Sequence, residues 1–177
     1  MEEMEHAQTK LSRVARWAEN ENMECCEKDA RQVSENETAI VTRCILETKS
    51  QAASEMTVKQ VICLVDCLAK KYDVVDADGY LDTEKAALLI KAKDHWGQLF
   101  ANKDDVIKRC VTFANSFSKE RGTVVFEEKK CNMAPAVITN CIRAMVEINC
   151  PEDRKVPGAQ CDKLRRKLSQ VVDALNI

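Results

Sequence analysis

The chain has 177 residues, a length that suits one domain with its own core or two small ones. Its 27 Lys and Arg nearly balance its 29 Asp and Glu, and the net charge of −2 argues against a nucleic-acid binder that relies on a basic surface. It has only 4 Gly and 3 Pro, and its aliphatic residues recur at helical spacing, which predicts an all-α protein. No apolar run reaches the roughly 18 residues that a membrane span requires.

The first half of the chain predicts four helices. A short one lies around residues 11–18, and a second covers about 38–48. Thr57 and Gln60 form a capping box that opens a third helix. A fourth helix is expected over about 82–93, and Asp82 can cap it.

The second half predicts three more helices. A capping signal at Asn102 opens a longer helix that ends at Gly122, a favoured helix terminator. Pro135 suits the first turn of a helix that reaches Asn149. A last helix is expected over about 162–175.

The ten cysteines form an even set that is typical of a disulfide framework in a secreted protein. The first ten residues, MEEMEHAQTK, lack the apolar core of a signal peptide. We therefore interpret Met1 as an expression start on a processed chain, and we infer secretion and an extracellular location from the cysteines alone.

Cys63 and Cys67 lie four residues apart on one expected helix. Their Cβ atoms would be about 5–6 Å apart, whereas a disulfide tolerates roughly 3.5–4.5 Å, so each cysteine must bond a different partner. Cys-x3-Cys is a weak match to a zinc or redox site. Both cysteines point away from the apolar face of Val58, Val61, Ile62, Val65 and Ala69, so their bonds would sandwich the helix in the centre of the fold. Such a scaffold suits either an internal cavity or a filled core.

The spacing of the cysteines carries a family resemblance. From Cys44 it reads C-x18-C-x3-C-x42-C-x20-C-x9-C-x8-C-P-x9-C, with Pro151 directly after Cys150. This spacing resembles that of insect odorant-binding proteins of the plus-C group, with the x3 and x8 intervals similar to the family's six-cysteine signature. The stretch CLAKKYDVVDADGYLD is also similar to the family's central helix and following turn. The resemblance covers about residues 38–161.

The resemblance implies a compact, disulfide-stapled bundle of about six to eight helices around an apolar cavity. Such a protein carries small hydrophobic ligands, including odorants, and has no catalytic residues; we expect no cofactor or metal. The family pairs its first cysteine with the third, the second with the fifth and the fourth with the sixth. Carried over, this pairing implies Cys44–Cys67, Cys63–Cys141 and Cys110–Cys150. Two further bonds would join Cys25 and Cys26 to Cys131 and Cys161, in either order.

Large apolar residues gather in the middle of the sequence and on the inward faces of the expected helices. Each one singly would suit an ordinary core. With the resemblance, we expect about half of the following to touch ligand: Leu88, Leu89, Trp96, Leu99, Phe100, Phe113, Phe117, Phe126, Ile138, Ile142 and Met145. The flexible thioether of Met145 adapts well to varied apolar shapes.

Two other signals favour plain structural readings. VVDADGYLDTEK resembles a calcium loop, but Val74 and Lys85 occupy the end positions that need oxygen ligands, so we expect a turn followed by a helix. His95 has no supporting hydrolase motif, so a surface histidine is expected, with pH sensing as the alternative.

The C-terminal helix predicts an extension, residues 162–177, packed on a main domain of residues 1–161. Five aliphatic side chains fall on one narrow face and must be buried: Leu164, Leu168, Val171, Val172 and Leu175. We expect this helix to cover the cavity, either within its own chain or across a homodimer. The sequence thus favours a secreted, non-enzymatic carrier, with a secreted helical signalling or interaction protein with a filled core as the alternative.

Overall fold

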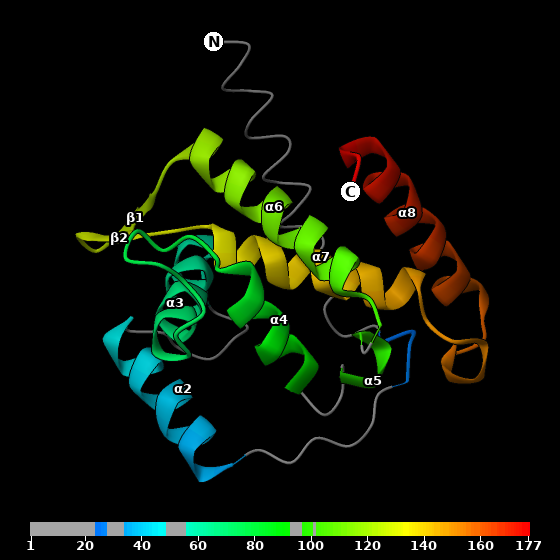
Figure 1. Ribbon diagram of the computed structural model, residues 1–177, viewed down its shortest axis with the longest axis horizontal. Helices are drawn as coiled ribbons and strands as arrows, with labels where there is room; N and C mark the ends of the chain where they lie inside the picture. The colour runs from blue at the N-terminus through cyan, green and yellow to red at the C-terminus, as the bar shows by residue number, and fades with distance from the viewer. Residues whose placement is uncertain (1–23, 28–33, 49–55, 93–96, 101) are drawn as a thin grey trace.

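The computed structural model describes residues 24–27, 34–48, 56–92, 97–100 and 102–177. The protein is mostly helical, as predicted. Helix α7 runs through the middle of the molecule, with α6 along one side, α3 and α4 on another, and α8 beside its C-terminal half (Figure 1). The helix expected around residues 11–18 lies outside the described residues.

The helices of the first half are α2 (Glu35–Glu47), α3 (Val58–Lys71), α4 (Thr83–Ala92) and the single-turn α5 (Gly97–Phe100). The capping box before α3 is confirmed: Gln60 N donates to Thr57 Oγ1 at 3.2 Å, and Thr57 N donates to Gln60 Oε1 at 2.8 Å. Asp82 caps α4 by accepting a bond from Lys85 N at 2.9 Å. These starts are determined by short sequence motifs, which is why the sequence predicts them.

The second half contains α6 (Asp104–Arg121), β1 (Val124–Phe126), β2 (Lys129–Cys131), α7 (Ala134–Ile148), a 3₁₀ turn (Glu152–Arg154) and α8 (Ala159–Leu175). Gly122 ends α6 with a φ of 78°, as expected of a glycine terminator. The cap expected at Asn102 is wrong, because Lys103 occupies the N-cap position and makes no side-chain cap bond. Helix α8 also begins earlier than residue 162.

The antiparallel hairpin of β1 and β2 is absent from the sequence prediction. Each strand has only three residues, too few for an alternating pattern to stand out. Glu127 and Glu128 form the tip, with φ values of 45° and 68° that a sequence without glycine there does not signal. The hairpin packs against α3.

The core is built around α7. Ala134, Ile138, Ile142, Met145 and Val146 are all buried, and they face more than one side of the helix. Helices α3, α6 and α8 pack against it. A helix that is apolar nearly all round is a buried helix, so α7 supplies the wall against which the other elements form cavities.

Asn132 ties three segments together at the start of α7. Its side chain is buried, and Oδ1 accepts bonds from Ser118 Oγ at 2.6 Å and from Ala134 N at 2.8 Å. Its Nδ2 donates to Asp78 O at 3.1 Å, in the turn before α4. The former calcium-loop candidate is therefore a turn followed by a helix, as expected, and it is held against α6 and α7.

All ten cysteines form disulfides, which gives the five bonds expected. The predicted Cys44–Cys67 bond is confirmed and joins α2 to α3. The other bonds are Cys63–Cys131, Cys110–Cys141, Cys26–Cys150 and Cys25–Cys161.

The predicted Cys63–Cys141 and Cys110–Cys150 bonds are wrong. The side of α7 that carries Cys141 lies against α6, where Cys110 is 5.7 Å away between Cα atoms. The pairing order of the resemblance nevertheless holds if Cys131 and Cys141 count as the fifth and sixth cysteines. The error came from assigning the x8 interval to the last pair, although the x9 interval before it is the one that fits.

The bonds of Cys63 and Cys67 place other segments on the polar side of α3, as the sequence predicts. Helix α2 and strand β2 cover that side, so both Cys63 and Asp66 are buried. The N-terminal end of the apolar face is less covered than expected, since Val58 and Val61 are exposed. Helix α3 is thus sandwiched along its C-terminal part.

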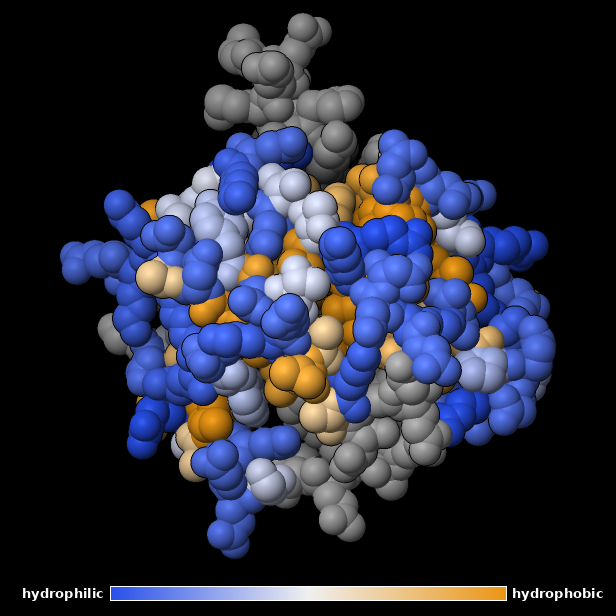
Figure 2. Space-filling view, viewed as in Figure 1, coloured by the Kyte–Doolittle hydropathy of each residue, from blue (hydrophilic) through white to orange (hydrophobic). Residues whose placement is uncertain are grey.

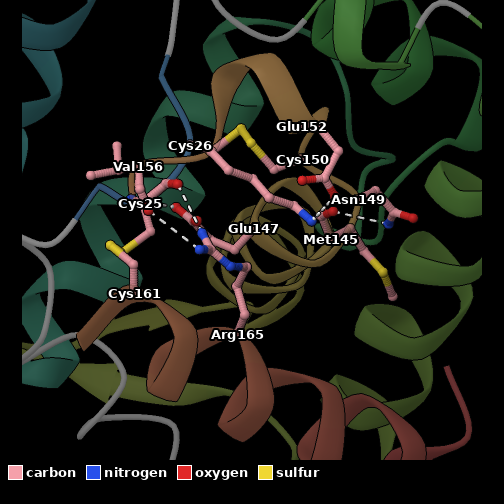
Figure 3. Close-up of a disulfide and its surroundings, with 11 residues drawn as sticks. Cys25, Cys26, Met145, Glu147, Asn149, Cys150, Glu152, Val156, Cys161 and Arg165 are labelled. Carbon is pink, nitrogen blue, oxygen red and sulfur yellow. Dashed lines mark hydrogen bonds and ion pairs between the residues drawn. A yellow bond between two sulfur atoms is a disulfide. The ribbon is translucent and has the colours of Figure 1, made fainter. Parts of the chain in front are cut away.

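The adjacent Cys25 and Cys26 fasten the N-terminal segment to two places at once (Figure 3). Cys26 bonds Cys150 at the end of α7, and Cys25 bonds Cys161 in α8. Arg165 of α8 adds a bond from Nη1 to Cys25 O at 3.1 Å. The expectation that Cys25 and Cys26 use Cys161 is confirmed, whereas Cys131 as their second partner is wrong.

Candidate ligand-binding pocket

An apolar pocket of about 200 Å³ lies between α3, α4 and α7. We call it the main pocket. Its walls are formed by Val65, Leu68, Ala69, Tyr72, Val74, Leu81, Ala86, Leu89, Ile90, Pro135, Ile138, Thr139 and Ile142.

The helical repeat explains why these residues meet. Pro135, Ile138, Thr139 and Ile142 follow the i, i+3, i+4, i+7 spacing that puts side chains on one face of α7. Val65, Leu68 and Ala69 of α3 and its C-cap residue Tyr72 follow the same spacing on the facing helix. The small side chain of Ala86 on α4 leaves room between them.

The opposite face of α7 borders a second, much smaller space of about 30 Å³, which we call the aromatic cavity. Phe113 and Phe117 of α6 line it, with ring centroids 6.0 Å apart. Val172 and Leu175 of α8 lie across from them, and Ile177 follows the helix. Helix α8 therefore covers the aromatic cavity, whereas none of its described residues lines the main pocket. The expected lid within its own chain is thus wrong for the main pocket, and the arrangement across a homodimer stays a prediction.

The surface reflects this arrangement. Apolar side chains reach it beside the C-terminal end of α8 and over α4 (Figure 2). Leu88 of α4 is 70% exposed, and Leu175 of α8 is 37% exposed. Exposed apolar groups thus lie on the two helices, α4 and α8, that border the main pocket and the aromatic cavity.

The residues expected to touch ligand fall into four groups. Leu89, Ile138 and Ile142 line the main pocket, and Phe113 and Phe117 line the aromatic cavity. Phe100 and Met145 are buried in the core, with Leu99 and Phe126 half-buried against it. Leu88 points to solvent and lines neither space, because it faces away from α7 one residue before Leu89. Trp96, with its neighbour His95, lies outside the described residues.

Several lining residues were not among those expected to touch ligand. They are Val65, Leu68, Ala69, Tyr72, Val74, Leu81, Ala86, Ile90, Pro135 and Thr139. Val65 and Ala69 were recognised as an inward stripe of α3, but an inward stripe alone does not separate a pocket wall from a filled core. The loop residues Val74 and Leu81 are brought together by the isolated bridge between Val75 and Leu81 and by the hydrogen bond from Asp82 N to Val74 O.

The main pocket contains two polar side chains, Tyr72 and Thr139, and no charged side chain among the described residues that line it. Thr139 Oγ1 donates to Pro135 O, one helical turn earlier, at 2.9 Å. Burying an ionised group here without a partner would cost several kcal/mol. The chemistry of the pocket is that of a shape-fitted apolar site.

Charged groups gather instead in a polar cleft of about 410 Å³ between α2, α3 and β2. There Lys70 Nζ bonds Asp66 Oδ2 at 2.8 Å, and Lys71 Nζ bonds Glu47 Oε1 at 3.0 Å. The hydrogen bond from Lys71 is the largest cause that lowers the pKa of Glu47. Within the described ranges, no three His, Cys, Asp or Glu side chains are grouped as a metal site would need, and no helix is long and apolar enough to span a bilayer.

The chain is similar to general odorant-binding protein 68 of Anopheles gambiae. The two are 26% identical over 159 residues, which cover 85% of this chain and 70% of the relative. No family model and no solved structure matches the chain with significance. The all-α scaffold with five disulfides and an apolar pocket is thus that of a distant homologue of a general odorant-binding protein.

Proposed function

We propose that the protein is a secreted, non-enzymatic carrier of small hydrophobic molecules such as odorants, and that they bind in the main pocket. The observation that carries the proposal is the lining itself: thirteen described residues from three helices and the intervening turn, all uncharged, around about 200 Å³. Small-molecule sites are concave and mostly apolar with few polar groups. The distant homology to an odorant-binding protein points in the same direction.

Secretion and membership of the plus-C group are part of the same proposal. Five disulfides are typical of an oxidising compartment. Six cysteines, namely Cys44, Cys63, Cys67, Cys110, Cys131 and Cys141, follow the family's pairing order. The remaining two bonds, Cys25–Cys161 and Cys26–Cys150, supply the additional staples that the plus-C resemblance implies.

We further propose that residues 162–177 act as a structural extension of the domain formed by residues 1–161. Cys161 fixes the first turn of α8 to Cys25, and Val172 and Leu175 rest over the aromatic cavity. The extension would then support α7 from the side opposite the ligand.

A matched pair of variants on α4 tests the site. Leu89→Trp places a large ring into the main pocket, whereas Leu88→Trp makes the same change on the neighbouring exposed residue. Calorimetric titration with menthol, a compact neutral terpenoid, should show binding to the native protein and to Leu88→Trp but strongly weakened binding to Leu89→Trp. Equal affinity of both variants for menthol would show that the ligand binds outside the main pocket. No binding to any of the three, with all disulfides intact, would favour an interaction protein with no carrier role.

A further inference from the structure

We propose that the main pocket selects neutral molecules with a hydroxyl group, alcohols or phenols, over carbonyl compounds and carboxylates of the same skeleton, and that Thr139 determines this selectivity. The inference rests on the proposed function, because it assigns a ligand class to the same pocket.

The hydroxyl hydrogen of Thr139 is already used. Thr139 Oγ1 donates it to Pro135 O at 2.9 Å, a bond that follows the helix backbone. A threonine hydroxyl has one hydrogen to donate and two lone pairs that accept. Toward the pocket, Thr139 therefore offers an acceptor, and its natural partner is a ligand O–H group.

A carbonyl ligand meets the opposite situation. Ketones, aldehydes and esters only accept hydrogen bonds, so Thr139 would have to give up its bond to Pro135 O before it could donate to them. Such a ligand exchanges one hydrogen bond of Thr139 for another and gains none, whereas a ligand hydroxyl adds a bond to the one that Thr139 already makes. A carbonyl oxygen next to Thr139 is thus held less well than a hydroxyl on the same skeleton.

An anionic ligand is disfavoured for a different reason. No Lys, Arg or His is among the described residues that line the main pocket. Lys70 and Lys71 of α3 line the polar cleft instead, where they pair with Asp66 and Glu47. An ionised carboxylate in the pocket would be desolvated without a cation to compensate it.

The volume sets the size of the ligand. A cavity of about 150 Å³ lined by apolar side chains accommodates benzene, so the main pocket, at about 200 Å³, suits a single ring with a few substituents. Menthol, menthone and p-menthane-3-carboxylate share one such skeleton and differ in the group that the pocket would distinguish.

The experiment is calorimetric titration of the full chain with these three compounds at neutral pH. We expect menthol to bind about fivefold more tightly than menthone, the ratio that one net hydrogen bond gives, and at least about tenfold more tightly than the carboxylate. Thr139→Val, which keeps the shape and removes the hydroxyl, should bring menthol and menthone to equal affinity. Thr38→Val is the matched control, because Thr38 of α2 makes the same kind of bond to Ser34 O at 3.2 Å but does not line the pocket, and it should leave their ratio unchanged.

The outcomes separate the two proposals. If none of the compounds binds, the proposed function fails. If menthol and menthone bind with equal affinity to the native protein, or if Thr139→Val leaves their ratio intact, the pocket is a carrier site but the assignment to Thr139 is wrong. Binding of the carboxylate as tight as that of menthol would overturn the exclusion of anions.

Discussion

Ile142 and Ala144 lie two residues apart in α7 and border different spaces: Ile142 lines the main pocket with α3 and α4, and Ala144 lines the aromatic cavity with α6 and α8. Two residues correspond to about 200° around a helix, so the two side chains point in nearly opposite directions. Helix α7 is therefore a shared wall. Changes on one face should affect ligand binding, and changes on the other should affect stability.

Phe117 tests the expectation that changes on the α6 side of α7 affect stability and not ligand binding. Phe117→Ala removes a half-buried ring from the aromatic cavity and should lower the free energy of unfolding by about 2 kcal/mol. Menthol affinity should stay the same, because Phe117 does not line the main pocket. Denaturant unfolding and calorimetry on the same sample measure both quantities. A large fall in affinity with unchanged stability would place the ligand on the α6 side.

Gly79 tests the attachment of the turn before α4. It has a φ of 87°, and a Cβ there would lie 2.8 Å from Asn132 Cβ. Gly79→Ala should therefore destabilise the protein by about 2–3 kcal/mol, the sum of backbone strain and a clash that displaces Asn132.

Gly122 shows what a glycine without such a contact costs. Its φ of 78° is similar, but no atom lies within 4 Å of the Cβ that alanine would add. Its ψ of −170° places it in a region that is essentially restricted to glycine, so Gly122→Ala should cost about 1–3 kcal/mol of backbone strain alone. The contact at Gly79 is tested by Asn132→Gly, which removes the clashing Cβ. If Gly79→Ala costs as much in that background as in the native protein, the contact with Asn132 does not contribute.

The paired disulfides at the N-terminal segment support each other. Cys25–Cys161 spans 136 residues and Cys26–Cys150 spans 124, so either bond alone closes a large part of the 177-residue chain into a loop. With Cys26–Cys150 intact, Cys25–Cys161 closes only a short additional loop. Cys25→Ala/Cys161→Ala should thus cost about 3 kcal/mol, compared with the roughly 5 kcal/mol of an isolated long loop.

Denaturant unfolding without reductant measures this difference. Removing both bonds together should lower the free energy of unfolding by more than either double variant does alone. If removing one bond already lowers the free energy of unfolding as much as removing both, the two bonds act as one unit.

The ion pair between Glu47 and Lys71 predicts how the free energy of unfolding depends on pH. The hydrogen bond from Lys71 lowers its pKa below the ordinary value of 4.5 in the folded protein. A lowered folded pKa means that the stabilisation is present above pH 4.5 and is lost as the pH falls through the folded pKa. The stability difference between the native protein and Glu47→Gln should therefore be largest near neutral pH and disappear in acid.

Lys71→Met serves as the control for Glu47. In that background the Lys71–Glu47 pair is already absent, so Glu47→Gln should change the pH profile much less. Urea unfolding from pH 3 to pH 7 follows both pairs of proteins. A difference that grows toward low pH would contradict the assigned sign.

The sequence predicts those parts of the fold that depend on neighbours in the chain. Thr57 and Gln60 determine the start of α3, and Gly122 determines the end of α6, so both are readable from a few residues. The β1–β2 hairpin is not readable, because three-residue strands have no periodic signal. The position of β2 depends on its pairing with β1 and on the distant bond from Cys131 to Cys63 in α3. The pairing of the cysteines likewise required knowing which face of α7 meets α6.

The pocket was only partly predictable for a similar reason. Ile138 and Ile142 were expected from the apolar stripe of α7, and they line the main pocket. Phe113 and Phe117 belong to an equally apolar stripe, but α8 lies across from it. Leu88 and Leu89 are identical side chains in sequence neighbours, and only their orientation relative to α7 separates an exposed residue from a lining one. Periodicity identifies buried faces, whereas tertiary packing decides which of them enclose space.

The most direct test of the central claim is a methyl-detected NMR titration of the full chain with menthol. The account predicts that methyl signals of Leu68, Leu89, Ile138 and Ile142 shift and show contacts to the ligand, while those of Val172, Leu175 and Leu88 do not. Shifts confined to Val172 and Leu175, with the methyl groups between α3, α4 and α7 unaffected, would contradict it.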